Sequence, residues 1–345
     1  MIIALFAFTT AGKQLRDRLA ELLKNRGHQI LPEPPPGSSL AERTAEAFRS
    51  GDALVFIGAA GIAVRAVAPL LRSKTEDPAV TVVDEKGQWA ISLLSGHLGG
   101  ANALTLEVAE SLGAVPVITT ATDINGVFAV DLWAKANGLV IGNVEKVKAV
   151  SMRLLEGEEL LLASEYPITG TIPRGLKKLD PKIDPKTEAP ASPPAIRVSV
   201  YQNPNEAEIL HLIPRCVYLG IGCRKGIGQD ALCATVTEAL SRQGLDIRSV
   251  AAVGTIDLKK DEPALTALCR QKGWPLLCYT AEELRAAGDG FSSSAFVAST
   301  VGVDNVCERA AFLASLSGSL LFRKFAAKGV TVAAAEGKIS LAFEG

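Results

Sequence analysis

The sequence predicts an α/β fold in which two layered α/β domains are joined by a small middle module and a Pro-rich linker. Strand-like apolar runs alternate with helix-period segments over the first 140 residues, and the same alternation starts again at Cys216. Six of the 18 prolines fall between Pro173 and Pro194. Since 345 residues exceed what one core usually serves, we expect domains at 1–137, 138–215 and 216–345.

The N-terminal domain is predicted from elements that alternate along the chain. We expect strands at 2–8, 53–57, 80–83 and 89–94, and helices at 12–25, at 41–49 and after the turn at 58–61. Residues 84–87 have the composition of a β-hairpin turn. A glycine-rich loop at 95–102 then opens a helix that ends at Gly113, and a β-rich segment and a polar turn at 119–123 follow.

The middle module and the C-terminal domain are predicted in the same way. Weak strand patterns at 138–141 and 196–201 flank the Pro-rich loop 173–194, which cannot sustain a helix or a central strand because proline lacks a backbone donor. The C-terminal domain should contain strands at 217–221, 250–254 and 275–279, and helices ending near 243 and at 305–315. Two β runs, at 320–325 and 339–343, should close it.

Composition argues against several classes of function. A net charge of −1 and 5% aromatic residues are poor properties for binding nucleic acid. None of the six cysteines forms a CxxC pair and no histidine cluster accompanies them, which argues against zinc. No apolar run approaches the roughly 20 residues that span a bilayer, and the first ten residues favour a buried strand over a signal peptide. We expect a cytoplasmic protein without membrane or nucleic-acid partners.

The loop at 95–102, SGHLGGAN, is the best candidate for chemistry. Glycines let a backbone approach a ligand closely, and the N-terminus of the following helix offers N–H groups to an anion. His97, one of three histidines, adds a group that moves protons near neutral pH. The alternative is a loop histidine bonded to backbone. His28 and His211 have the settings of surface and strand-end residues.

A second candidate is the glycine-basic loop at 220–228. It departs from the dinucleotide fingerprint and lacks the GKS or GKT of a P-loop, but Arg224 and Lys225 suit carboxylates or phosphates. The alternative is that its glycines only form a tight turn. Cys223 could act as a nucleophile or only pack. Lys259 and Glu262, at spacing i,i+3, could be an ordinary surface ion pair.

Arg65 follows the glycine turn at 58–61. It either solvates its own helix or joins Arg224 and Lys225 in receiving a ligand rich in carboxylates.

Taken together, these motifs resemble the CbiG family of cobalamin biosynthesis. The resemblance is carried by residues 56–65, 82–84, 94–102 and 118–123, and in the C-terminal domain, which is similar to CobE, by 220–224, 255–262 and 331–335. The chain departs from the family pattern at 303–311. There Asn305 stands in place of a serine and Arg309 in place of an alanine, while Glu308 is retained.

The resemblance implies hydrolysis of cobalt-precorrin-5A, in which a δ-lactone is opened and the C20 fragment leaves as acetaldehyde. Under it, His97 is the base, backbone N–H groups around residues 99–101 receive the oxyanion, and cobalt arrives with the substrate, so no cofactor is expected. Neighbouring enzymes of the pathway are candidate partners. The residues expected to bind the cobalt-corrinoid substrate are Arg65, Ser95, Gly99, Gly100, Asn102, Thr120, Asp123, Arg224, Lys225, Lys259 and Glu262.

Two alternatives from other classes stay open at this point. One is a carrier or scaffold that binds tetrapyrroles without turnover. The other is a nucleotide- or sugar-phosphate-binding α/β protein that uses the two glycine loops as anion cradles.

Overall fold

The computed structural model describes residues 1–33, 37–73, 76–97, 99–179, 195–202, 209–294, 298–299 and 301–343. It divides into two compact units, Met1–Leu132 and Trp133–Gly345. Strands and helices alternate in the first unit and again after residue 216, which confirms the α/β class. Most of the predicted Pro-rich loop, at 180–194, lies outside the described residues. Among the described residues, no helix is long and apolar enough to cross a membrane.

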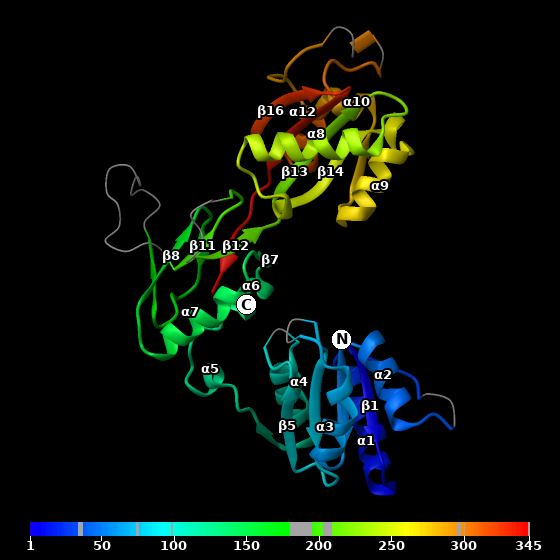
Figure 1. Cartoon of the computed structure of the whole chain (residues 1–345), viewed down its shortest axis with the longest axis vertical. Helices are drawn as coiled ribbons and strands as arrows, with labels where there is room; N and C mark the ends of the chain where they lie inside the picture. Colours follow the sequence, from blue (N-terminus) through cyan, green and yellow to red (C-terminus); the bar gives the residue numbers. More distant parts are fainter. Residues whose placement is uncertain are drawn as a thin grey trace. The chain divides into compact units, whose positions relative to one another are not determined.

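The first unit is a sheet with helices on both faces (Figure 1). Its strand order is β2-β1-β3-β4-β5-β6; β1 to β4 run parallel and β5 returns antiparallel to β4 through the predicted hairpin turn. The helix α6 (Val130–Ala136) crosses into the second unit. The other elements are β1 (Ile2–Ala7), α1 (Thr10–Asn25), β2 (Gln29–Ile30), α2 (Leu40–Ser50), β3 (Ala53–Ile57), α3 (Ala60–Val67), η1 (Ala68–Leu70), β4 (Ala79–Val83), β5 (Trp89–Leu94), α4 (Ala101–Leu112), β6 (Val115–Val117) and α5 (Ala121–Ile124).

Two hydrophobic layers hold this sheet. Val55 and Ile57 of β3 pack with α1 and α4, while Leu54 and Phe56 of the same strand pack with α2 and α3. Because both faces are covered, β3 is apolar at every position and fully buried. The sheet is therefore a rigid support for the loop that joins β5 to α4.

The second unit begins with the middle sheet, of order β10-β8-β11-β12-β7. Contrary to the prediction, the run at 339–343 does not join the C-terminal sheet: Leu341 pairs with Ile168 in the middle region. Backbone hydrogen bonds hold this run there: the Leu341 N–H donates to the Pro167 carbonyl and the Phe343 N–H to the Thr169 carbonyl, both at 3.0 Å. The elements are β7 (Leu139–Ile141), α7 (Glu145–Leu155), β8 (Leu160–Ser164), β9 (Ile168–Thr169), β10 (Leu176–Lys178), β11 (Ile196–Val198), β12 (Leu210–Pro214) and β18 (Leu341–Ala342).

The C-terminal sheet has the order β15-β14-β13-β17-β16. Strands β13 to β15 run parallel, and β17 is antiparallel to both of its neighbours. The sequence pattern does not predict β17, because its alanine-rich run lacks a clear period. The elements are β13 (Val217–Cys223), α8 (Gln229–Arg242), η3 (Ile247–Ser249), β14 (Val250–Ile256), η4 (Asp257–Lys259), α9 (Pro263–Lys272), β15 (Leu276–Tyr279), α10 (Ala281–Ala286), α12 (Cys307–Ala314), β16 (Ser319–Ala327) and β17 (Val330–Glu336).

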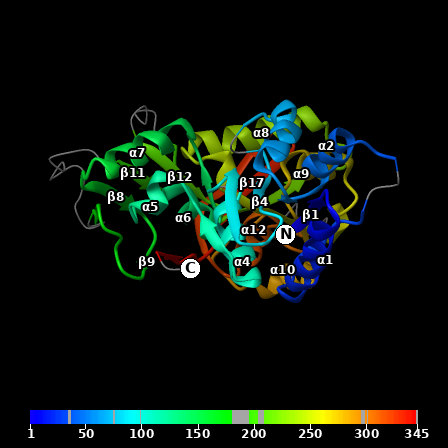
Figure 2. The same ribbon diagram turned by 90° about the horizontal axis from the view of Figure 1, so that it is seen from below.

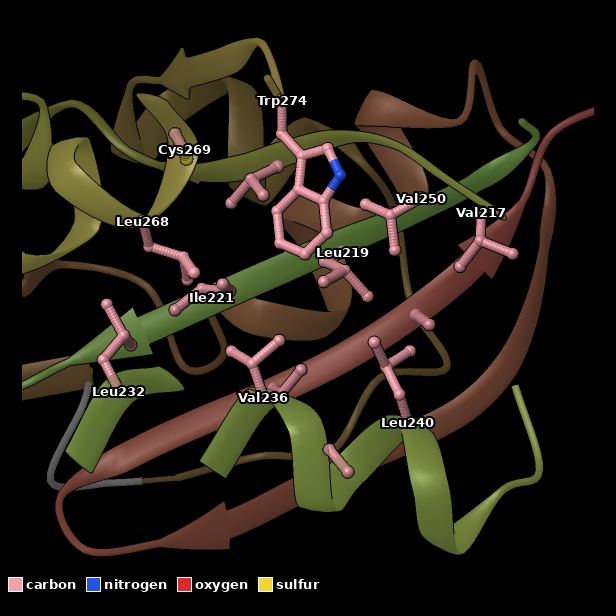
Figure 3. Close-up of a cluster of buried hydrophobic side chains, with 14 of the residues drawn as sticks. Val217, Leu219, Ile221, Leu232, Val236, Leu240, Val250, Leu268, Cys269 and Trp274 are labelled. Carbon is pink, nitrogen blue, oxygen red and sulfur yellow. The ribbon is translucent and has the colours of Figure 1, made fainter. Parts of the chain in front are cut away.

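Helices α8 and α12 cover opposite faces of this sheet (Figure 2). On one face, Leu219 and Ile221 of β13 contact the apolar side of α8 (Figure 3). On the other face, Cys307 and Ala311 of α12 pack on the alanines of β17. Small residues there let the helix backbone approach the strands closely.

The glycine-basic loop predicted at 220–228 starts later than expected, although the strand predicted at 217–221 already included Gly220. Gly220 and Gly222 belong to β13, so the loop itself begins only at Arg224. A Cβ at Gly220 would overlap the carbonyl oxygen of Cys307 and lie 2.6 Å from the amide nitrogen of Ala311. The physical reason for glycine here is therefore close helix packing and not a turn.

Candidate functional site

The loop between β5 and α4 is shaped by its own backbone. Ser95 has a φ of 57° and Gly100 a φ of 86°, both in the left-handed region. A Cβ at Gly96 would lie 2.7 Å from Asn102 Oδ1, and one at Gly99 would lie 2.8 Å from the Ser95 carbonyl oxygen. Glycine is therefore required at these positions so that the loop can fold tightly around Ser95 and Asn102.

The N–H groups at the start of α4 form hydrogen bonds within this tightly folded loop. Gly100 donates to the His97 carbonyl at 2.9 Å, Ala101 to the Ser95 carbonyl at 3.1 Å, and Asn102 to the Gly96 carbonyl at 3.0 Å. The amides of Gly100 and Ala101 are thus already used inside the loop, and oxyanion binding by the amides around residues 99–101 stays a prediction.

His97 is mostly buried and held by polar groups on both sides of its ring. Its Nε2 lies 2.9 Å from Asp123 Oδ2 and 2.9 Å from Thr122 Oγ1. Its Nδ1 faces Asp131 Oδ1 at 3.7 Å, which is too far for a hydrogen bond, and this nitrogen is buried without a hydrogen-bond partner among the described residues. The ring is thus fixed at Nε2 and unpaired at Nδ1.

Asn102 connects this histidine to the sheet. Its amide nitrogen donates to Thr120 Oγ1 at 3.1 Å and to Asp123 Oδ2 at 3.0 Å, and its carbonyl oxygen accepts from Ser92 Oγ at 2.6 Å. Both donors of the buried amide are therefore used inside the protein. Asn102 and Thr120, predicted to bind substrate, contact Asp123 or one another, so their geometry suits positioning of Asp123.

Two carboxylates set the electrostatics of His97. The pKa of His97 lies above its usual range. The main cause is Asp131, which faces Nδ1, and Asp123, which is bonded to Nε2, adds to it, whereas burial lowers this pKa. In turn, His97 holds the pKa of Asp131 below its usual range although burial opposes this. The arrangement stabilises the imidazolium form. Asp131 is the residue that sequence reasoning missed, since its only signal is an acid in an apolar segment.

Replacing Asp131 with asparagine should lower the pKa of His97, because the carboxylate that favours a proton on Nδ1 is gone. With three histidines in the chain, the titration can be followed for each imidazole by NMR. We expect the His97 titration to move to lower pH, and the acidic limb of any His97-dependent activity to move with it. Asp17→Asn, at an exposed carboxylate of the same unit, is the control. An unchanged His97 titration would contradict the assignment.

Replacing Asn102 with alanine should disorder Asp123 and destabilise the first unit by about 1–3 kcal/mol, since buried partners lose their hydrogen bonds. Thermal unfolding measures this loss. Ser111→Ala, which removes a hydroxyl bonded only to the Glu107 carbonyl on the same helix, is the matched control and should change stability far less. Equal stability of the two variants would show that Asn102 does not organise the site.

A second group of predicted residues lies at the carboxyl ends of β13 and β14. Glu262 Oε2 pairs with Lys259 Nζ at 3.1 Å, and its Oε1 accepts the Gly226 N–H at 2.9 Å. The side chains of this pair are only 15% and 6% exposed, so the surface ion pair considered from the sequence is wrong. The pair is buried and fixes the loop at Gly226, whereas Arg224 and Lys225 remain exposed.

Cys223 packs between these groups. Burial raises the pKa of the Cys223 thiol. The charge of Lys259 lowers this pKa and the charge of Glu262 raises it. A thiol that resists ionisation is a poor nucleophile, so the packing alternative fits the structure better.

The structure also places three other residues considered from the sequence. Arg65 is exposed and donates to the Gly61 carbonyl at 3.2 Å on its own helix, and within the described chain no hydrogen bond or ion pair joins it to His97. His28, expected at the surface, bonds Glu107 Oε1 at 2.9 Å. His211, expected at a strand end, is the second residue of β12 and is buried.

At 303–311, where the sequence departs from the family pattern, the substituted side chains form hydrogen bonds within the C-terminal part of the chain. Asn305 Oδ1 accepts the Glu308 N–H at 2.9 Å, which is the capping role of a serine. The buried Glu308 carboxylate accepts the N–H groups of Ser292 and Lys324. Arg309 donates to the Gly288 carbonyl at 2.7 Å. These residues hold the segment before α12 and act structurally.

In the described ranges, no three His, Cys, Asp or Glu side chains gather as a metal-ligand set. The structure thus presents two groups of predicted residues. His97, Asn102, Thr120 and Asp123 meet in the first unit, and Ser95 lies in the same loop as His97. Lys259 and Glu262 meet in the second, beside the loop that bears Arg224 and Lys225.

Comparison with known proteins places the chain in one family. Three family models match consecutive parts of the chain: Cobalamin synthesis G N-terminal at 42–123, Cobalamin biosynthesis central region at 128–214, and Cobalamin synthesis G C-terminus at 217–335. A cobalt-precorrin-5A hydrolase of Salmonella typhimurium is 39% identical over 96% of each chain. One of Priestia megaterium is 34% identical over 84% of this chain and 79% of its own.

Two solved structures of cobalamin biosynthesis proteins also match the chain. A cobalamin biosynthesis protein G homolog from Sulfolobus solfataricus covers 98% of this chain and 96% of its own at 20% identity, with a TM-score of 0.41. CobE, from the cobalamin biosynthetic pathway, covers 36% of this chain and 92% of its own at 29% identity, with a TM-score of 0.34. The curated relatives are named as hydrolases, which supports an enzyme. From the family models and these identities, the chain belongs to the CbiG family of cobalamin biosynthesis proteins.

Proposed function

We propose that this protein hydrolyses cobalt-precorrin-5A, opening its δ-lactone and releasing the extruded two-carbon fragment as acetaldehyde. Family membership supports the substrate, and one observation carries the chemistry. An imidazole is fixed at Nε2 by Asp123, while its Nδ1 is unpaired and faces a second carboxylate at 3.7 Å. Such a group can take up and return protons near neutral pH.

The reaction needs several proton transfers. Attack of water on the lactone carbonyl gives a carboxylate and a hydroxyl on the extruded carbon. Removal of that hydroxyl proton then lets the carbon–carbon bond break, its electron pair passing into the macrocycle, which takes up a proton. A single base can take a proton from the attacking water, return it to the leaving alkoxide and then take the proton of the hydroxyl.

His97 is the residue proposed for these transfers. Because Asp123 is an acceptor, it fixes a proton on Nε2, so Nδ1 is the nitrogen that titrates. Asp131 favours the protonated form once Nδ1 has accepted a proton. Movement of Asp131 away from Nδ1 when substrate binds is part of this proposal, because Nδ1 is buried here.

Ser95 is a further proposed donor to the lactone oxyanion. Its hydroxyl oxygen is buried without a hydrogen-bond partner in the described part of the chain. A buried hydroxyl with unused donor capacity costs free energy unless a ligand supplies the partner. The left-handed backbone at Ser95 is a second cost that a functional role explains.

Substrate carboxylates are assigned to the exposed cations Arg224, Lys225 and Arg65. Lys259 is already paired with Glu262, so its proposed role is to hold the loop that carries Arg224. Cobalt enters as part of the substrate in this proposal.

The test is incubation of the protein with cobalt-precorrin-5A under anaerobic conditions, with acetaldehyde measured by an NADH-coupled alcohol dehydrogenase. Mass spectrometry of the corrinoid should show gain of water and loss of the two-carbon aldehyde. Tight binding without acetaldehyde would favour the carrier alternative. A rise in melting temperature with nucleotides but not with corrinoids would favour the phosphate-binding alternative.

A further inference from the structure

We propose that Lys328, at the tip of the β16–β17 hairpin, forms with Arg224 and Lys225 a three-cation site for neighbouring substrate carboxylates. This inference rests on the proposed function, which supplies a ligand rich in carboxylates. Three observations carry it: the conformation of the hairpin turn, the contact between that turn and Arg224, and the absence of an ion pair to these cations among the described residues.

The hairpin turn places a lysine where its backbone is disfavoured. Ala327 pairs with Val330, so Lys328 and Gly329 form a two-residue loop. Their φ angles are 49° and 79°. Positive φ at both positions is the pattern of a type I′ turn, which favours Asn, Asp or Gly at the first position. A lysine held there against this preference points to a role for its side chain.

The turn lies directly against Arg224. The Arg224 N–H donates to the Gly329 carbonyl at 3.0 Å, and a Cβ at Gly329 would lie 2.8 Å from Arg224 Cδ and Nε. The side chain of Arg224 therefore crosses the tip of the hairpin beside Lys328. Gly329 is needed both for its φ and for this close approach.

The three cations project from one edge of the sheet. Cys223 pairs with Val330, so the hairpin tip lies at the carboxyl end of β13, where Arg224 and Lys225 follow. This end of parallel strands is where α/β sheets commonly bind ligands. All three side chains are exposed.

No acidic side chain of the described residues forms an ion pair with Arg224, Lys225 or Lys328. Glu262, which bonds the same loop at Gly226, is already paired with Lys259. Three exposed cations at one edge, without an ion pair among the described residues, suit a ligand that presents two or more carboxylates together.

The test uses uroporphyrin III, an unreactive tetrapyrrole with eight carboxylates, as the binding probe. Lys328→Asn removes the cation and introduces a residue that the type I′ turn prefers. We expect the melting temperature to stay the same or rise, while affinity for the porphyrin falls about three- to tenfold, in line with loss of a partly exposed charged contact. Lys338→Asn, which removes the same charge beyond the far end of β17, is the matched control and should bind normally.

An unchanged affinity in folded Lys328→Asn would overturn the inference. If that variant failed to fold, Lys328→Gly, which a type I′ turn also accepts, gives the same comparison. Tripolyphosphate displacing the porphyrin at equal concentration would overturn the assignment to carboxylates. Failure of the wild type to release acetaldehyde would overturn the proposed function alone, since the binding measurement does not depend on turnover.

Discussion

Replacing His97 with glutamine should reduce acetaldehyde release from cobalt-precorrin-5A by about 10²–10⁴-fold, the usual contribution of a positioned proton-transfer group. Glutamine can still bond Asp123 through its amide but cannot carry a proton between reacting atoms. We therefore expect kcat to fall, while substrate affinity, measured by fluorescence or dialysis, changes little. Coupled detection of acetaldehyde measures the rate.

The matched control for this variant is His28→Gln. His28 also pairs with a carboxylate of the first unit, Glu107, but lies outside the loop at 95–102. Its variant should turn over substrate at close to the wild-type rate. Full acetaldehyde release by folded His97→Gln would exclude His97 as the base.

The largest effect on stability is expected from Gly220→Ala. The added methyl would overlap the carbonyl oxygen of Cys307 and lie 2.6 Å from the Ala311 amide nitrogen, and both are backbone atoms that cannot move independently of α12. The helix would have to separate from β13, so we expect a loss of more than about 4 kcal/mol or failure to fold. Denaturant unfolding of the full chain measures it.

Gly228→Ala is the internal control for that loss. Gly228 lies in the same glycine-rich stretch, has a φ of −70°, and a Cβ there would meet nothing within 4 Å. We expect a change within about 1 kcal/mol, since only the helix N-cap preference is affected. Equal destabilisation by both substitutions would mean that close packing is not what requires glycine at 220.

The sequence allowed the layered fold to be predicted because periodicity is a local property. Continuous apolar runs such as 53–57 indicate strands covered on both faces, and the hairpin at 84–87 follows from turn composition. Periodicity does not show which strands pair or which helix packs on which strand. The short run at 341–342 pairs with β9 and not with its predecessor in sequence, and β17 is alanine-rich because α12 packs closely on it.

For the candidate site, the sequence likewise indicated the residues but not their contacts. The glycine loop with His97 stands out by composition, and Asn102, Thr120 and Asp123 do lie beside it. Their roles differ, because hydrogen-bond partners are set by tertiary contacts: Asn102 uses its donors internally, and Asp131 approaches His97 from a segment with no recognisable motif. Lys259 and Glu262 share a helical spacing that gave no indication of burial.

The strand β18 makes contacts of the middle region depend on a distant part of the chain. The Ala342 carbonyl accepts Trp133 Nε1–H at 2.7 Å and the Asn137 amide at 3.0 Å, so these contacts join residues more than 200 positions apart in the sequence. The first unit, in contrast, is compact within residues 1–132. A chain cut after β17 would keep the five strands of the middle sheet but would lose the pairing of β18 with β9 and these two hydrogen bonds.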